Sequence, residues 1–317
     1  GKNSPWRYVV MFAVILIATN TVGAIPLLIG YITKAASDPS VVPEIAENPN
    51  DLGVLGFDPN MGLFMMLFPF LIGLLAFIIL VKPLNYRTFK LTVNGTGMFR
   101  WNRFLVSALV WTILSSVYFF ICLKLDPSNY SLKNTSETLI PLIIISLIFI
   151  PFQAAFEEVL FRGYLMQGFA VLFRNRWFPL VITSVLFGLM HAFNPEVKEF
   201  GFFTMMSQYI LFGLIFGIIT ILDDGIEAAI GAHAANNIFL CIFVTHESSA
   251  LQTPALYEQQ ILYPFTEFAS LLITGIIFLV ILKMIFKWGS YSLVLSSVKP
   301  KPEPDQSPYT DVLSSVR

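Results

Sequence analysis

Residues 139–173 read LIPLIIISLIFIPFQAAFEEVLFRGYLMQGFAVLF, and this stretch decides how the chain folds. It is the longest apolar run of the sequence, and it is too long for one simple membrane span. Because Pro141 and Pro151 lie in it, we expect a tilted or kinked helix. Three ionisable side chains sit near its end, within residues 154–163. Such groups are costly inside a membrane and therefore indicate a functional site.

The three ionisable side chains of this stretch are Glu157, Glu158 and Arg162. On a helix, Glu158 and Arg162 are four residues apart and can pair along one face. Glu157 points about 100° away from Glu158 and is left without that partner. The pattern predicts one carboxylate tied up in an ion pair and one free carboxylate.

Composition places the chain among integral membrane proteins. Of its 317 residues, 56% are hydrophobic and only 12% are charged, against roughly 25% charged in soluble domains. The mean hydropathy is +0.74. The net charge of −1 gives no indication of nucleic-acid binding. Cys122 and Cys241 both lie in apolar segments and are expected to pack as small hydrophobic side chains.

The hydropathy pattern predicts an all-α, polytopic membrane helix bundle of about eight transmembrane helices. The first helix is expected to be an uncleaved span, because its apolar run continues past a possible signal-peptide cleavage site. The acids at the start of the seventh span, Asp223, Asp224 and Glu227, have the pattern of helix-capping groups. The expected spans are residues 8–32, 61–81, 104–123, 139–173, 178–193, 202–222, 226–245 and 266–286.

Eight spans put both termini on one side of the membrane. Lys and Arg concentrate in the segments that would then be cytoplasmic, as the positive-inside rule prefers. Residues 1–289 are expected to form the bundle, with a motif-bearing core at about 140–244. Residues 290–317 contain four prolines and are expected to be a mobile cytoplasmic tail. A bacterial cytoplasmic membrane is the favoured location, with the endoplasmic reticulum as the alternative.

Two further spans carry polar groups that lipid-facing helices should not carry. His191 follows Phe187 by four residues in the fifth span. His233 and Asn237 share one face of the seventh span, among small residues that allow close helix packing. The third histidine, His246, lies beside Glu247 and is expected to be a solvated loop residue.

Each of these features also has a packing interpretation. A lone intramembrane histidine, or a His/Asn pair, often only joins two helices by a hydrogen bond. The pair of Glu158 and Arg162 favours a structural role over a catalytic one, since pairing lowers the cost of burying both charges. The coincidence of a free carboxylate, two histidines and an asparagine on three helices exceeds what packing requires. It favours a catalytic site.

The set is compatible with two kinds of chemistry. A carboxylate in a low-dielectric site can act as general base towards water, an imidazole can hold that water, and a His/Asn pair can stabilise an oxyanion. These are the parts of a peptide hydrolase that needs no Ser or Cys nucleophile. Glu157, His191 and His233 could instead hold a divalent metal such as zinc with an open position. No cofactor is favoured from the sequence.

The motifs resemble those of a known family, the CAAX-protease and bacteriocin-processing (CPBP, or Abi) intramembrane proteases. EEVLFR at 157–162 is similar to their E-E-x-x-x-R motif, FGLMH at 187–191 to F-x-x-x-H, and HAANN at 233–237 to H-x-x-x-N/D. The resemblance covers residues of about 140–244. It implies the following roles: Glu157 as catalytic carboxylate, His191 as its partner on the water, His233 and Asn237 at the oxyanion, and Glu158 with Arg162 as structural support.

The leading hypothesis is therefore an intramembrane endopeptidase acting on a membrane-embedded or lipid-anchored, CAAX-like peptide substrate. A proton-coupled transporter could use the same buried groups, although no repeated halves are visible. A non-catalytic immunity or scaffolding protein is the third possibility. One difficulty is depth: His233 lies only about 10 Å into its span, and His191 about 20 Å into its own.

Overall fold

The structure is a computed structural model and describes residues 1–43, 56–133 and 136–298. Among these residues, six helical stretches are long and apolar enough to cross a membrane. The six stretches are α1 with α2 (Pro5–Asn20 and Ile25–Ser37), α4 (Pro59–Asn85), α6 (Trp101–Leu125), α7 with η4 and α8 (Ser136–Glu158, Val159–Met166 and Gln167–Phe173), α11 (Phe202–Asp223) and α13 (Pro264–Phe286).

Two shorter helices complete the predicted order of spans. The apolar helix α9 (Trp177–Met190) has 14 residues, and α12 (Glu227–Phe243) has 17 residues, most of them buried. The prediction of an all-α, multi-pass membrane bundle is thereby confirmed. The remaining elements are short: η1 (Pro39–Val41), α5 (Phe89–Val93), η3 (Pro127–Asn129), β1 (Tyr130–Leu132), α10 (Pro195–Phe200), β2 (Val244–His246), β3 (Tyr257–Gln259) and η5 (Tyr291–Leu295).

The first span differs from the single helix predicted. A turn over residues 21–24 separates α1 from α2. Gly23 lies in this turn so close to α4 that a Cβ there would be 2.8 Å from the Cα of Pro69. Pro26 stands in the first turn of α2, where its missing N–H costs nothing. The close contact at Gly23 and the proline together explain why the helix restarts.

The long fourth span changes geometry at the motif, not at its prolines. Pro141 and Pro151 lie inside α7, and the backbone leaves regular α geometry only after Glu158, where the π-helix η4 begins. π-Helical turns are rare and are often found at functional sites.

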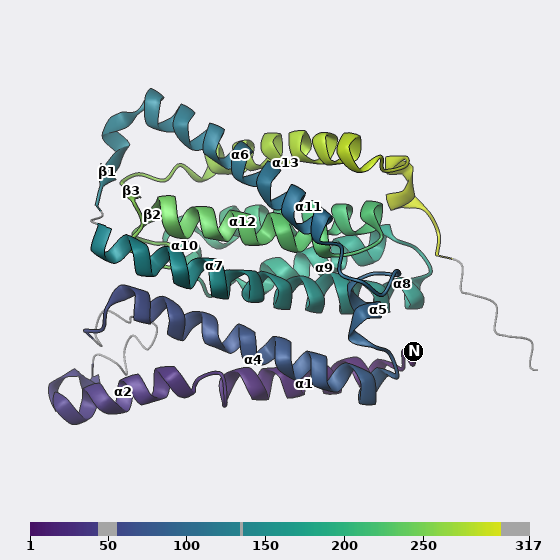
Figure 1. Ribbon diagram of the computed structural model, residues 1–317, viewed down its shortest axis with the longest axis horizontal. Helices are drawn as coiled ribbons and strands as arrows, with labels where there is room; N and C mark the ends of the chain where they lie inside the picture. Colours follow the sequence, from purple (N-terminus) through teal and green to yellow (C-terminus); the bar gives the residue numbers. More distant parts are fainter. Residues whose placement is uncertain (44–55, 134–135, 299–317) are drawn as a thin grey trace, which may run out of the picture.

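Helix α12 lies in the middle of the bundle (Figure 1) and packs against α6, α7 and α11. Its small residues permit this: a Cβ on Gly231 would lie 2.2 Å from the backbone oxygen of Phe104 in α6. On the outer side, α4 packs between α7 and α1. The helix with the His/Asn face is therefore enclosed by protein and not by lipid.

One end of the bundle, which we call the basic end, holds the start of α1 and the end of α13 (Figure 1). Here Arg100 binds Glu227 at 2.7 Å and Asp223 at 3.0 Å, and Arg103 binds Asp223 at 3.3 Å. Trp288 Nε1 also donates to Asp223. The interpretation of Asp223, Asp224 and Glu227 as capping groups was wrong: Ile226 is the N-cap of α12 and no side chain makes a capping hydrogen bond there, although Glu227 lies in the first turn.

This network explains how two acids are kept buried at an acidic turn that has no basic residue of its own. Glu227 has no exposed surface, and Asn94 also donates to its carboxylate. Burial works to lower the pKa of Arg100, but the hydrogen bond that Arg100 donates to Glu227 and the charges of Asp223 and Glu227 outweigh it, so the pKa is raised. The loop before α6 thereby supplies the positive charge that the turn before α12 lacks.

The opposite end carries a small sheet in the strand order β1-β3-β2, with β3 antiparallel to β1 and parallel to β2. A hydrogen bond from Lys133 lowers the pKa of the Glu258 carboxyl in β3. The sheet joins the loop after α6 to the loop after α12.

The predicted tail divides into two parts. Of residues 290–317, those from 299 on lie outside the described residues. Residues 290–298 contain η5 and return to the basic end, where Val298 N donates to Arg174 O.

We expect Arg100→Met to lower the free energy of unfolding by about 3 kcal/mol, because it leaves the Glu227 carboxylate buried without its guanidinium. Arg174→Met, at an exposed position of the same end, is the matched control and should leave stability unchanged. The measurement is thermal unfolding of both variants in the same detergent. Equal losses in the two variants would contradict the stabilising role of the network.

Candidate functional site

Two pairs of side chains at four-residue spacing face each other across α7 and α12. His233 lies opposite Glu157, with 3.7 Å between Nε2 and Oε2. One turn earlier in α7 and one turn later in α12, Asn237 Nδ2 donates to Gln153 Oε1 at 2.9 Å. Because the chain positions pair in opposite order, the two helices run antiparallel, and both pairs fall on the facing sides.

The predicted pair of Glu158 and Arg162 is present and fully buried. Glu158 Oε1 accepts from Arg162 Nη1 at 3.0 Å and lies 2.8 Å from His233 Nδ1. Arg162 Nη2 donates to the backbone oxygen of Gly213 at 3.1 Å, and its guanidinium lies 4.5 Å from the centre of the Phe187 ring. The pair thus connects the η4 segment to α9, α11 and α12, as support for the site.

The environment of Glu157 leaves one carboxylate oxygen available. Its Oε1 accepts from Gln153 Nε2 at 2.5 Å. Its Oε2 is buried and receives no hydrogen bond from the described residues. His233 Nδ1 faces a carboxylate, which accepts only, so Nδ1 carries the hydrogen, and Nε2 is the nitrogen that faces Oε2.

His191 lies just beyond the last residue of α9, as its C-cap. Its Nδ1 is 2.8 Å from the backbone oxygen of Phe187, and this carbonyl also fixes Nδ1 as the protonated nitrogen. The imidazole stacks on Tyr209, with 4.2 Å between ring centres and 18° between planes. The Tyr209 hydroxyl donates to Glu196 and accepts from Asn194 Nδ2 at 3.0 Å.

The expected difference in depth between the two histidines is bridged by one phenylalanine. Phe187 lies 4.9 Å from His191 and 5.9 Å from His233, measured between ring centres. Phe216 stacks on His233, with 5.0 Å between ring centres. Both histidines therefore contact the same aromatic side chain, although they lie at different distances from the starts of their helices.

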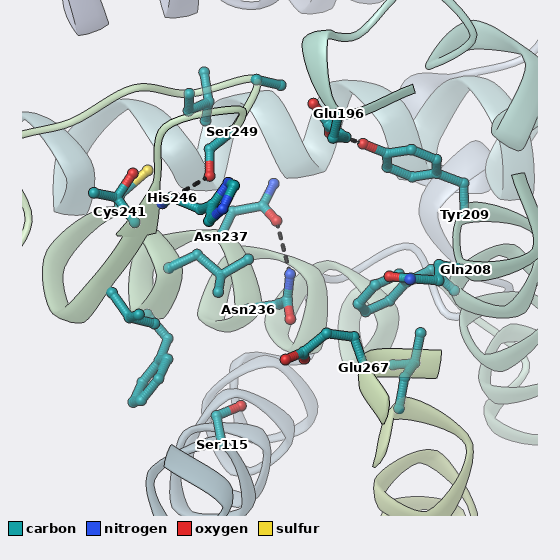
Figure 2. A pocket seen from close by; sticks show the side chains of 18 of the residues that line it. Ser115, Glu196, Gln208, Tyr209, Asn236, Asn237, Cys241, His246, Ser249 and Glu267 are labelled. Carbon is teal, nitrogen blue, oxygen red and sulfur yellow. Dashed lines mark hydrogen bonds between the residues drawn. The ribbon is translucent and has the colours of Figure 1, made fainter. Parts of the chain in front are cut away.

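Glu157, His191, His233 and Asn237 all line one cavity of about 470 Å³, whereas Glu158 and Arg162 lie behind its wall. His246 lines the same cavity and is half-buried, so it is not the solvated loop histidine expected from the sequence. Figure 2 shows Asn236 and Asn237 on one side of the cavity and the Glu196–Tyr209 pair on another. Among the described residues, the lining also includes Glu267 but no Lys or Arg.

Sequence reasoning missed several polar residues of this cavity, above all Gln153, Glu196 and Tyr209. A signal existed for Gln153, which precedes Glu157 by four residues and so shares its helical face. Glu196 follows His191 closely in the chain. Tyr209 lies on α11, a helix in which the sequence shows no motif.

The residues as placed do not fit a metal ion. Both histidines direct Nδ1 to an acceptor and so keep the Nε2 lone pair, as a metal ligand would. However, no three His, Cys, Asp or Glu side chains of the described ranges gather as a ligand set. The set of Glu157, His191 and His233 suggested by the sequence is not assembled in this arrangement, so we derive no reaction step through a metal.

Comparison with known proteins identifies the family. The family described as "Type II CAAX prenyl endopeptidase Rce1-like" matches residues 136–239, which include all seven residues of the three motifs. The chain is also 30% identical over 250 residues to "Uncharacterized protein YyaK" of Bacillus subtilis (strain 168), covering 78% of this chain and 81% of that protein. No solved structure matches the chain. On these grounds the chain belongs to the Rce1-like family of type II CAAX prenyl endopeptidases.

Proposed function

We propose that the protein is an intramembrane endopeptidase in which Glu157 activates a water molecule. One observation carries the proposal: the Oε2 atom of Glu157 is buried, receives no hydrogen bond from the described residues, and belongs to a side chain that lines a cavity together with His191 and His233. The family supports protease activity in general. The catalytic type and the roles of the residues are our inference.

The reaction begins when Glu157 takes a proton from water through Oε2. The resulting hydroxide attacks the carbonyl carbon of the scissile peptide bond, and the carbonyl electrons move onto its oxygen. When this tetrahedral intermediate collapses, the C–N bond breaks and the proton held by Glu157 passes to the leaving nitrogen. The products are a carboxylic acid and an amine, and Glu157 returns to its ionised form.

The neighbouring residues hold the water and the developing charge. His191, fixed by Phe187 and Tyr209, accepts a hydrogen bond from the water through Nε2. Asn237 uses one Nδ2 hydrogen for Gln153 and has a second for the oxyanion. His233 precedes Asn237 by one turn on the same face of α12 and is assigned with it to the oxyanion.

The substrate is a peptide held in or at the bilayer, either membrane-embedded or anchored by a lipid. The cavity has apolar and aromatic walls drawn from α4, α6, α11 and α12, which suits a substrate that carries a hydrocarbon chain. We place the basic end, which holds the start of α1 and the end of α13, on the cytoplasmic side of a bacterial membrane.

We expect Glu157→Gln to lower kcat by about a thousandfold, because the amide cannot accept the proton of water. The assay follows cleavage of a fluorogenic peptide that ends in a farnesylated CAAX sequence, with purified protein in liposomes. Glu137→Gln, an exposed position at the start of the same helix, is the matched control. Unchanged cleavage by Glu157→Gln would end the proposal. Proton flux into the liposomes without cleavage would favour a transporter.

We expect dialysis against EDTA and phenanthroline to leave the cleavage rate unchanged, because the proposed route uses only side chains and water. The metal content of the dialysed protein is measured by atomic emission, so that removal is verified. Loss of activity on removal, with recovery on adding Zn²⁺, would establish the metal-dependent version and contradict the glutamate route.

A further inference from the structure

Five side chains from three helices form one continuous line of hydrogen bonds that ends on Glu157. Trp111 Nε1 in α6 donates to Asn236 Oδ1 at 3.2 Å, and Asn236 Nδ2 donates to Asn237 Oδ1 at 3.0 Å. Asn237 Nδ2 then donates to Gln153 Oε1 at 2.9 Å, and Gln153 Nε2 to Glu157 Oε1 at 2.5 Å. Figure 2 shows the central step between Asn236 and Asn237.

The chemistry of the two ends determines the direction of this line. An indole N–H can only donate, and an ionised carboxylate can only accept. The three amides between them can be turned either way, since their oxygen and nitrogen are nearly alike in shape. Only one arrangement satisfies all four bonds: every amide turns its oxygen towards Trp111 and its NH₂ towards Glu157.

Burial enforces this orientation of the three amides. Trp111, Gln153 and Glu157 are 2%, 6% and 7% exposed, so an unmade hydrogen bond is not replaced by bulk water. The Trp111 ring is itself held by Phe278 in α13, edge to face at 4.9 Å. The donor at the far end is therefore fixed independently of the amides.

We propose that Gln153, Asn236 and Trp111 are positioning residues for Glu157, a role that rests on the proposed function. Gln153 donates a hydrogen bond to Oε1 of Glu157, which leaves Oε2 of Glu157 as the oxygen that contacts the water. Asn236 and Trp111 hold the two amides before Gln153 in the orientation that presents NH₂, not oxygen, to the carboxylate. A tryptophan outside the residues matched by the family thereby takes part in the site.

The first test separates the indole N–H from the ring. Trp111→Phe keeps the contact with Phe278 and removes the donor. We expect kcat to fall about tenfold, the size of one lost hydrogen bond, with KM unchanged. The unfolding temperature should fall only slightly, because the smaller ring leaves a small space in a buried position. Trp101→Phe, an exposed position on the same helix, is the control and should leave both constants unchanged. An unchanged kcat in Trp111→Phe would overturn the proposal.

The second test reverses the polarity at Gln153. Gln153→Glu opposes a carboxylate to Glu157, whereas Gln153→Met only removes the hydrogen bonds. We expect Gln153→Glu to be the slower of the two at neutral pH and to recover as the pH is lowered, because protonation gives the introduced carboxyl a hydrogen to donate. If Gln153 only filled space, the two variants would have equal activity at every pH, and that result would overturn the proposal.

A third measurement does not depend on cleavage. The indole ¹⁵N–¹H NMR signal of Trp111 should shift in Glu157→Gln, because the change at one end of the line alters the polarisation along it, while the Trp101 signal stays in place. A Trp111 signal that does not move would contradict the line of hydrogen bonds from Trp111 to Glu157. If the Trp111 signal shifts in Glu157→Gln but the unsubstituted protein cleaves no probe peptide, the line of hydrogen bonds is retained and the proposed protease activity is rejected.

Discussion

The fold around the site depends on one buried charge, the guanidinium of Arg162. A charged group without exposed surface is tolerated only where it is paired and hydrogen-bonded. Arg162 meets most of this requirement with Glu158, a backbone oxygen from α11, and the faces of Phe187 and Phe216, while its Nε has no hydrogen-bond partner among the described residues. Glu158 in turn holds His233 of α12. The elements that carry the three motifs are therefore joined through the pair of Glu158 and Arg162, and the cavity forms beside this pair.

The site has a division of tasks between neighbouring carboxylates. Glu158 has its Oε1 shared between a guanidinium and an imidazole, behind the cavity wall. Glu157 has Oε1 held by an amide and Oε2 turned to the side where His233 Nε2 lies. Adjacent positions on a helix diverge by about 100°, which is what allows one acid to support and the other to face the cavity.

The spacing of residues along the chain was sufficient to predict side-chain contacts within one helix, but not contacts between helices. The pairing of Glu158 with Arg162 and the shared face of His233 and Asn237 follow from i, i+4 geometry and could be predicted. The partners of Asp223 and Glu227 could not, because Arg100 and Arg103 lie more than a hundred positions away in the sequence. The same holds for Trp111 and Tyr209, whereas Gln153 shares a helical face with Glu157 and could have been found from spacing. The break after α1 also depends on a neighbour, Pro69 in α4.

The charge of the cavity wall has a consequence for the fate of the product. Its described lining carries Glu157, Glu196 and Glu267 and no Lys or Arg. Hydrolysis of a peptide bond creates a new carboxylate inside this space. With no guanidinium or ammonium there to hold it, and the ionised Glu157 beside it, the acid half of the product is held weakly. In the proposed enzyme, cleavage would thus weaken the binding of its own product, so that turnover is favoured over product inhibition.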